Sequence, residues 1–224
     1  MADKILLTLA AFELLFLVSG GLIMGFSVVS KESLSKDLTI SNVAQHILLQ
    51  ETPTPLTAGI VNAVFIFVSF LFVLPAFFLR TNKGWLRIHG WAVVVSGTFT
   101  LIVGLIIWIE TLRTRSLLGK IWASEQPSTQ NLLQEKFKCC GYFSPSSPPF
   151  VQDDICPDAQ TAAVKGGCIG KFSSFANQYL DVVFTAAFGI VGVDALVVMC
   201  VAMELKNRAE QARYRHIDEK NGFT

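Results

Sequence analysis

Charged residues are scarce in this chain of 224 residues, because Asp, Glu, Lys and Arg together make up only 16% of it. An ordinary soluble domain carries roughly a quarter charged residues. The formal net charge is +1, so nothing in the composition indicates a nucleic-acid partner. Apolar residues, 52% of the chain, are instead gathered in long runs. This composition predicts a membrane protein.

Motifs of catalysis and of metal binding are missing as well. The three histidines, His46, His89 and His216, are isolated in the sequence. Neither a phosphate-binding loop nor a nucleophile elbow occurs. No Asn-x-Ser/Thr sequon occurs either, so we do not expect N-glycosylation. We therefore expect no enzyme, no metal site and no cofactor other than a bound lipid.

Four apolar runs each approach the roughly 20 residues that a helix needs to cross the hydrocarbon core of a bilayer. Helices are the open-ended structures that can span lipid with every backbone group satisfied. The first run has the charged start of a signal peptide. It is, however, longer than the roughly 7–15 apolar residues of a signal sequence, and it contains Glu13. We therefore predict four transmembrane helices.

The charge of a short connector predicts the orientation. Arg80, Lys83 and Arg87 lie between the second and third runs with no acidic residue among them. Because Lys and Arg bias short loops to the cytosol, both termini are predicted to be cytosolic. The predicted order is cytosolic residues 1–4, span 5–29, small outer loop 30–56, span 57–79, cytosolic loop 80–90, span 91–109, large outer loop 110–178, span 179–203 and cytosolic tail 204–224.

Four of the five cysteines, Cys139, Cys140, Cys156 and Cys168, lie in the large outer loop. An even cluster on a polar loop indicates disulfides in an oxidising compartment. Adjacent cysteines rarely bond each other, so each of the first two is expected to pair with one of the last two, and two connectivities remain. A zinc site is the alternative, but the spacing lacks the paired C-x-x-C units of common zinc sites. The predicted fold is an all-α membrane protein with four transmembrane helices and a small disulfide-stapled helical extracellular domain.

The large outer loop is predicted to begin with two helices. The first continues the third span and carries an apolar face of Leu117, Leu118, Ile121 and Trp122. Pro127 ends it, Ser128 caps the second helix, and Gly141 supplies the left-handed turn at that helix's end. Residues 142–167 show no sustained period and are predicted to be irregular. The small outer loop is too short for a core of its own and is expected to lie against the larger one.

This arrangement resembles the tetraspanin family: four spans, a short first and a long second outer loop, and Cys139-Cys140-Gly141 followed by two later cysteines. The first span is also similar to the family pattern, since Glu13 precedes the paired glycines Gly20 and Gly21 by seven positions. The resemblance implies disulfides from Cys139 to Cys168 and from Cys140 to Cys156. The chain departs from the family where the first-span polar residue is usually Asn, and in the Asp-Asp-Ile-Cys-Pro sequence around Cys156.

Two stretches, 84–91 and 117–122, look like the fungal member of the family that appressoria need for host penetration. That likeness implies a role in organising the plasma membrane at the penetration site of infection cells.

Two carboxyl groups lie inside the predicted spans at matching depth. Glu13 and Asp194 are each roughly 12–14 Å from the cytosolic edge at 1.5 Å per residue. No Lys or Arg lies at that depth, so we expect the two to face each other inside the bundle and to share a proton or both be neutral. They would either anchor a lipid hydroxyl, as in tetraspanins that hold a sterol between the spans, or form an interhelical hydrogen bond without a ligand.

Three further features concern packing and traffic. The motif Gly21-x-x-x-Gly25 is expected to pack against a helix of the same chain rather than to form a homodimer. Cys200 lies near the cytosolic boundary and is a candidate for palmitoylation, or else a small buried apolar residue. Tyr214 and Ile217 fit the Tyr-x-x-apolar pattern of endocytic sorting, which predicts endosomal or vacuolar traffic beside a plasma-membrane location.

The leading hypothesis for function is a non-catalytic membrane organiser. It would bind other integral membrane proteins through residues 142–167 and through its transmembrane faces, and it would bind membrane lipids. A channel or carrier that uses Glu13 and Asp194 is the alternative, although rings of charge along a path are missing. A junctional adhesion protein of claudin-like plan carries its long cysteine-bearing loop first, whereas here it is second.

Overall fold

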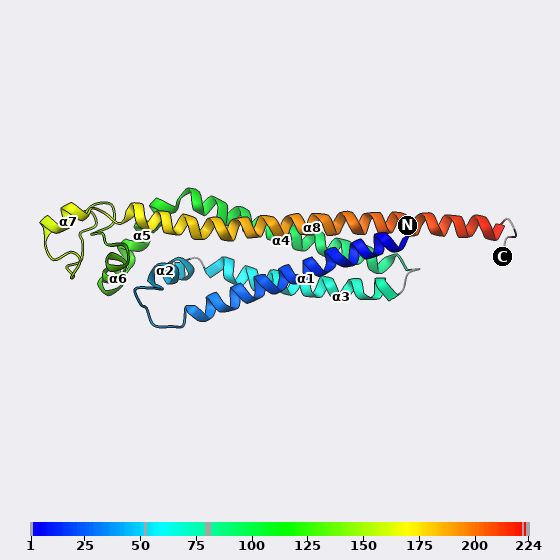
Figure 1. Ribbon diagram of the computed structural model, residues 1–224, viewed down its shortest axis with the longest axis horizontal. Helices are drawn as coiled ribbons and strands as arrows, with labels where there is room; N and C mark the ends of the chain where they lie inside the picture. Colours follow the sequence, from blue (N-terminus) through cyan, green and yellow to red (C-terminus); the bar gives the residue numbers. More distant parts are fainter. Residues whose placement is uncertain (1, 52, 79–81, 221, 223–224) are drawn as a thin grey trace. The chain divides into compact units, whose positions relative to one another are not determined.

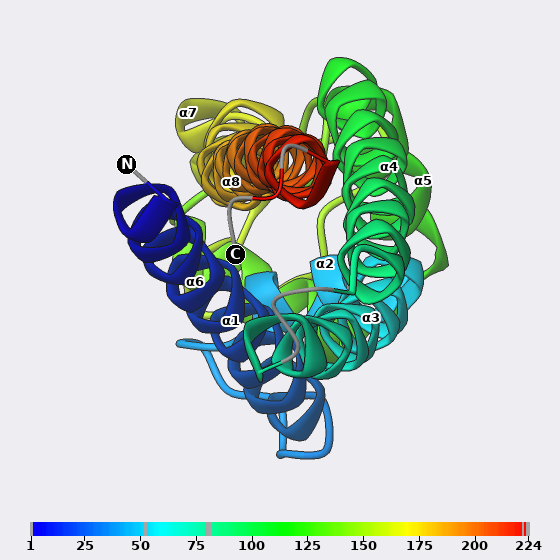
Figure 2. The ribbon, with the colours of Figure 1, turned by 90° about the vertical axis from the view of Figure 1, so that its right-hand side faces the viewer.

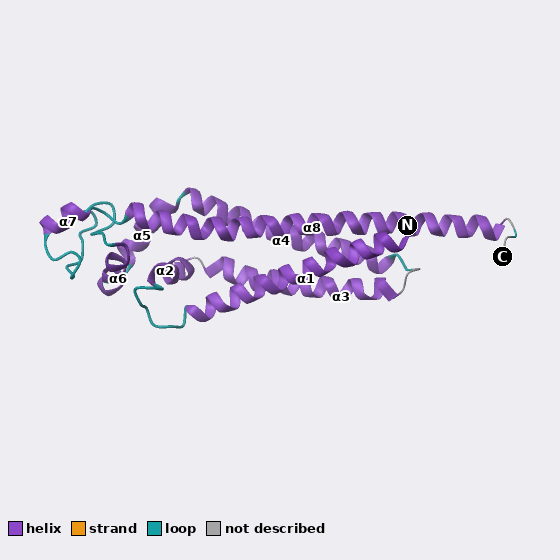
Figure 3. Cartoon of the chain, viewed as in Figure 1, coloured by secondary structure: helices purple, strands orange, loops and turns teal. Residues whose placement is uncertain are grey.

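The computed structural model describes residues 2–51, 53–78, 82–220 and 222. Arg80, assigned above to the cytosolic connector, lies outside the described residues. Within them the chain is helical and has no β-strand (Figures 1 and 3). The helices are α1 (Ala2–Ser33), α2 (Val43–Glu51), α3 (Pro53–Phe78), α4 (Gly84–Leu112), α5 (Thr114–Ser124), α6 (Pro127–Phe137), α7 (Ala159–Lys165) and α8 (Ile169–Lys220).

Four of these helices, α1, α3, α4 and α8, are long and apolar enough to cross a membrane. The prediction of an all-α protein with four spans is thereby confirmed. The candidate spans are Lys4–Ser33, Leu56–Phe78, Gly84–Leu112 and Ile169–Lys220. Three of them exceed the predicted lengths, because helical backbone geometry continues into polar flanks where the apolar run has already ended.

The chain divides into two compact units. The span unit consists of residues 1–27, 57–104 and 186–224, and the head unit of residues 28–56 and 105–185. In the span unit α1 packs on α3, α3 on α4, and α4 on α8, an order that Figure 2 shows end on. The head unit contains α2, α5, α6, α7 and the first turns of α8.

Small residues set the helix contacts of the span unit. A Cβ added to Gly20 would lie 2.6 Å from Ile66 Cγ2 of α3, so this glycine permits the close approach of α1. In contrast, a Cβ on Gly21 or Gly25 would meet nothing within 4 Å. The expectation that Gly21-x-x-x-Gly25 packs within the chain is therefore wrong. The neighbouring Gly20 makes the intramolecular contact instead, because consecutive residues point in directions that differ by 100° about the helix axis.

The head unit has its own apolar core, centred on Trp122 of α5. Helix α2 contributes Val43, Ala44, Ile47 and Leu48 to this core, and α8 contributes Phe172 and Ala176. The small outer loop thus lies against the larger one, as expected. Full burial of a side chain such as Ile47 of α2 stabilises the folded state by about 1.5–3 kcal/mol, so α2 contributes to the stability of the head.

The helix that enters the head is interrupted, whereas the sequence predicts a continuous one. Helix α4 ends at Leu112 and α5 begins at Thr114, because the backbone of Arg113 leaves helical geometry (φ −110°, ψ 8°). The hydroxyl of Thr114 donates to the carbonyl of Thr111 at 2.7 Å. The predicted apolar face of α5 is nevertheless present, with Leu118, Ile121 and Trp122 buried.

Both ends of α6 differ from the prediction. Pro127 is its first residue, a position where the missing N–H costs nothing, and Gln126 rather than Ser128 is the N-cap. At the other end Lys138 adopts the left-handed conformation (φ 51°) that was predicted for Gly141. Gly141 also has positive φ (70°), but it serves the turn after the paired cysteines.

The segment 142–167 is only partly irregular, because it contains α7. The backbone N–H of Thr161 donates to Asp158 Oδ1 at 2.6 Å and caps this short helix. The same hydrogen bond lowers the pKa of the Asp158 carboxyl. No apolar period revealed α7, because Ala162 is the one buried residue among its seven.

Backbone pairing closes the head around the paired cysteines. Cys140 N donates to Gly166 O at 2.9 Å, Cys168 N to Gly141 O at 2.9 Å, and Ile169 N to Tyr142 O at 3.0 Å. Between these bonds, a Cβ on Gly167 would lie 2.5 Å from the carbonyl oxygens of Tyr142 and Phe143. Only a residue without a side chain fits there.

We predict that Gly167→Ala lowers the free energy of unfolding of the head by about 1–3 kcal/mol, because the added methyl group forces two backbone segments apart. Thermal unfolding of the full chain in detergent measures the effect. Gly170→Ala is the matched control, since a Cβ at that exposed helical position meets nothing within 4 Å. Equal stability of the two variants would contradict the role given to Gly167.

Candidate functional site

Two disulfides cross-link the head. Cys139 bonds Cys168 across 29 positions, and Cys140 bonds Cys156 across 16. These are the two pairs that the family resemblance implies, and all four sulfur-bearing side chains are fully buried. Closing loops of this length stabilises the folded state by about 3 kcal/mol each in the chain-entropy model. The bridges tie the end of α6 both to the start of α8 and to the middle of the segment 142–167.

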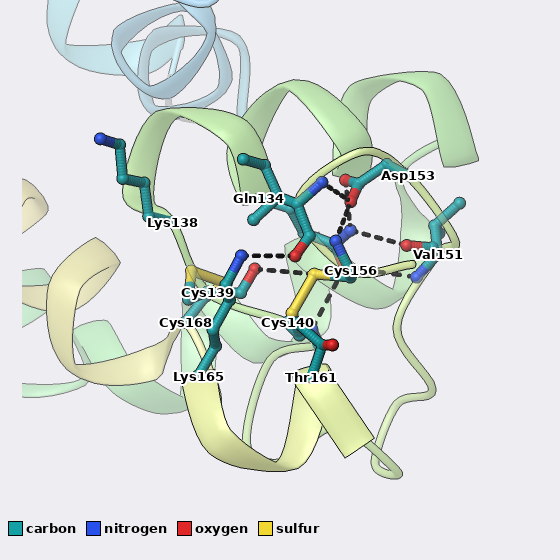
Figure 4. Close-up of a disulfide and its surroundings, with 12 residues drawn as sticks. Gln134, Lys138, Cys139, Cys140, Val151, Asp153, Cys156, Thr161, Lys165 and Cys168 are labelled. Carbon is teal, nitrogen blue, oxygen red and sulfur yellow. Dashed lines mark hydrogen bonds between the residues drawn. A yellow bond between two sulfur atoms is a disulfide. The ribbon is translucent and has the colours of Figure 1, made fainter. Parts of the chain in front are cut away.

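A buried amide connects α6 to that segment (Figure 4). Gln134 Nε2 donates to Val151 O at 2.8 Å and to Asp153 Oδ2 at 2.7 Å. Its Oε1 accepts from Gly141 N at 3.2 Å and from Val151 N at 3.3 Å. Asp153 Oδ1 in turn accepts from the backbone N–H of Cys156. Gln134 and Asp153 therefore position the Cys140–Cys156 bridge.

Gln134 was not among the site residues predicted from the sequence. Its signal was a polar residue on the inner face of a helix, three positions before Phe137 and next to Leu133. Four hydrogen bonds to a fully buried amide account for it, since a buried polar group without partners is costly.

The stapled frame holds the base of the segment 142–167 and leaves other parts in solvent. Tyr142 is fully buried against Trp122, and its hydroxyl donates to Arg115 O at 2.7 Å. Burial raises the pKa of Tyr142 to about 12. By contrast, Phe143 is 54% exposed and Val164 is 88% exposed. Exposed apolar side chains on a rigid base can serve as contacts for another protein.

The span unit contains a buried acid–imidazole pair. Glu13 Oε1 lies 2.6 Å from His89 Nε2, and His89 Nδ1 lies 2.8 Å from the carbonyl oxygen of Ser69. Because a carbonyl only accepts, Nδ1 carries a hydrogen and donates it. One further proton then lies between Nε2 and Oε1. Whether it sits on the imidazole or on the carboxyl, the pair has no net charge, so it is less costly to bury in lipid than a lone carboxylate.

The expected pairing of Glu13 with Asp194 is wrong. Glu13 Oε2 and both carboxyl oxygens of Asp194 are buried and have no hydrogen-bond partner within the described residues. Asp194 packs instead against α4, where a Cβ on Gly97 would lie 3.1 Å from Asp194 Oδ2.

His89 was placed in the loop 80–90 by the sequence analysis, but it lies in the second turn of α4. The helix begins at Gly84 because the side chain of Asn82 accepts from the Gly84 N–H at 2.8 Å. The Asn-Lys-Gly sequence at 82–84 was the signal that the helix starts before the apolar run does.

The grouping of Ser69, His89 and Glu13 is not a catalytic triad. The Ser69 hydroxyl donates to Phe65 O of its own helix at 2.7 Å, and His89 contacts the Ser69 carbonyl rather than the hydroxyl. A nucleophile would need its hydroxyl hydrogen-bonded to the imidazole. Within the described residues, moreover, no group of three or more His, Cys, Asp or Glu side chains could hold a metal ion.

The remaining predicted site residues lie on α8. Cys200 is 4% exposed in the core of the span unit, so acylation would require the thiol to leave that core. Arg208, which the sequence analysis missed, donates to Glu204 Oε1 at 2.7 Å and to Ala76 O near the end of α3 at 2.9 Å. Its charge suits the free carbonyls at a helix C-terminus. Tyr214 and Ile217 are exposed and helical.

A comparison with known protein families agrees with this architecture. The family model described as Tetraspanin family matches residues 5–208, which include the paired cysteines, Glu13 and Asp194. No curated protein and no solved structure gives a significant match to the chain.

A double-mutant cycle tests the buried pair. Glu13→Ala and His89→Ala should each lower the free energy of unfolding by about 1–3 kcal/mol, because each leaves a buried polar partner unsatisfied. The double variant should lose less than the sum, with a coupling of about 1 kcal/mol. Thermal unfolding in detergent provides the measurement, and Glu32→Ala, an exposed carboxyl on the same helix, is the control. Strict additivity of the two changes would show that the pair does not interact.

Proposed function

The chain belongs to the tetraspanin family, and on that premise we propose that it is a non-catalytic membrane organiser that gathers particular membrane proteins around itself. Members of this family are membrane scaffolds that interact with other membrane proteins and with lipids. In this chain, other integral membrane proteins would bind the segment 142–167 of the head, and further contacts with them would form along the outer faces of the spans.

The single observation that carries the proposal is the contrast within the segment 142–167. Its base is fixed by two disulfides and by the fully buried Gln134, whereas Val164 and Phe143 extend into solvent. A fixed base lowers the entropy that the segment loses on binding, so exposed apolar side chains can contribute to affinity. The buried pair of the span unit supports a structural rather than a catalytic role for Glu13.

We further propose that the head lies outside the cytosol and both termini inside it. Two disulfides persist in an oxidising compartment, and Lys83 and Arg87 follow the inner end of a span. The plasma membrane is the proposed location, with sorting through Tyr214 and Ile217 and acylation of Cys200. Sorting would require an adaptor that accepts the two side chains from a helix, or a local unwinding of α8.

The stretches 84–91 and 117–122 support a narrower proposal, a role at the penetration site of fungal infection cells. They contain His89, which pairs with Glu13, and Trp122, at the centre of the head core. Both stretches therefore also contribute to the packing of the protein.

Partner capture has a direct test. We predict that Val164→Asp lowers the yield of heterologous membrane proteins cross-linked to the chain in intact membranes by roughly fivefold or more, since loss of an anchor residue costs more than about 1 kcal/mol. Leu38→Asp, which changes an apolar residue that is 39% exposed outside the segment 142–167, should leave the yield unchanged. Non-reducing peptide mapping verifies that both variants keep the two disulfides. Equal partner yields from the two variants would refute the proposed surface.

A second candidate function is binding of a lipid hydroxyl, such as that of a sterol, inside the span unit. It is favoured by three buried carboxyl oxygens, on Glu13 and Asp194, that have no hydrogen-bond partner in the part of the chain that the structure describes. A hydroxyl donor would satisfy one of them. A channel or carrier is less well supported, because His89 already neutralises Glu13.

Photoactivatable sterol labelling tests this candidate. Asp194→Leu should lower labelling of the full chain in membranes roughly fivefold, because it removes one hydrogen bond to the sterol, which contributes about 1 kcal/mol to binding. Glu13→Gln should lower it if the same hydroxyl reaches both carboxyls. Asp181→Leu changes an exposed carboxyl of the same helix and is the control. Unchanged labelling in Asp194→Leu and Glu13→Gln would leave the two carboxyls with a packing role alone.

A further inference from the structure

The head unit contains a small hollow that none of the functions above uses. It has a volume of about 150 Å³ and lies between the end of α1 and one face of α2. Ser33, Leu34 and Lys36 line one side, and Asn42, Gln45 and His46 line the other. A single water needs only about 10–15 Å³ of such volume, so the hollow has room for a group of several atoms.

His46 presents an unused acceptor in this region. Its Nε2 lies 3.0 Å from the carbonyl oxygen of Leu34, and because a carbonyl accepts, Nε2 carries the hydrogen. Nδ1 is then a bare acceptor. It is buried and has no hydrogen-bond partner within the described residues. A group that fills the hollow should therefore bring an O–H or N–H donor to Nδ1.

The opposite side offers a cation. Lys36 is exposed and forms no ion pair with another described residue. The neighbouring acids Glu32 and Asp37 do not line the hollow. The ammonium group therefore favours an anionic oxygen on the ligand. Asn42 is already engaged, because its side chain bonds the backbone of Thr39 and Asp37.

Position indicates the source of the ligand. Ser33, on the rim of the hollow, follows the apolar run that ends at Val29 of the same helix, so the hollow lies just beyond the hydrocarbon, at the depth of lipid headgroups. Leu34 and Leu49 add apolar wall on the two sides. We propose that the hollow binds a phospholipid headgroup that carries free hydroxyls, such as phosphoglycerol or phosphoinositol, with a hydroxyl donating to His46 Nδ1 and Lys36 donating to the phosphate.

The proposal separates two contributions that common lipids distinguish. Phosphatidylcholine has the phosphate but no hydroxyl, whereas phosphatidylglycerol has both. The site therefore prefers phosphatidylglycerol, and that preference depends on His46. His46→Gln places an amide nitrogen where Nε2 was, which retains a donor for Leu34 O, and removes the Nδ1 acceptor. Lys36→Gln removes the cation. Lys31→Gln is the matched control, because this lysine lies on the same helix end but does not line the hollow.

The test counts lipids retained by the full-length chain in native mass spectrometry after release from nanodiscs of phosphatidylcholine mixed with phosphatidylglycerol. Wild type and Lys31→Gln should retain phosphatidylglycerol preferentially. His46→Gln should lose the preference, and Lys36→Gln should retain roughly tenfold less of it, the worth of one charge-assisted hydrogen bond. Non-reducing peptide mapping verifies the head disulfides of each variant.

Three results would overturn the proposal. Equal retention of the two lipids by wild type means that the hollow holds water only. An equal loss in Lys31→Gln and Lys36→Gln means unspecific charge attraction. Full displacement by soluble glycerol phosphate means that the ligand is not a lipid. Cross-linking of partner proteins does not depend on any of these outcomes, so this inference and the organiser function fail separately.

Discussion

The cross-linked turn at Cys139-Cys140-Gly141 is the constraint on which the head depends. Two adjacent cysteines leave the end of α6 in different directions, one to the start of α8 and the other into the segment 142–167. Backbone hydrogen bonds from the turn to Gly166 and Cys168 close the same junction. Because the core is so small, the covalent links hold the head in one conformation, and only exposed side chains such as Val164 can change without loss of the frame.

The span unit meets a different constraint, which is the cost of polar groups in lipid. One carboxyl oxygen of Glu13 contacts His89, and the Asn62 amide donates to the Thr100 hydroxyl at 2.7 Å, so polar links join α1 to α4 and α3 to α4. Asp194 has no such partner among the residues that the structure describes. An organiser needs a stable bundle rather than a path for ions, and paired polar groups inside the bundle suit that function better than a row of free charges.

Much of the architecture could be predicted from local features. Four apolar runs gave four spans, and the cysteine cluster with its Gly indicated a stapled head, because both depend on composition and on short spacing. The apolar face of α5 was found for the same reason. Helix starts were predicted less well, since Gly84 and Pro127 begin helices through caps and backbone geometry rather than through hydrophobic period. Helix α7 gave no periodic signal.

By itself the sequence determined the number of spans, the helical class and the residues available for disulfides, since chain length, hydropathy and residue type decide them. Only the tertiary structure decided which groups meet. The partner of Glu13 is His89, 76 positions away, and not Asp194 at the same depth; the intramolecular contact of α1 is made by Gly20 and not by Gly21 and Gly25. Such contacts depend on the rotation of each helix about its axis, where a shift of one residue moves a side chain by 100°. Packing of the whole bundle fixes that rotation.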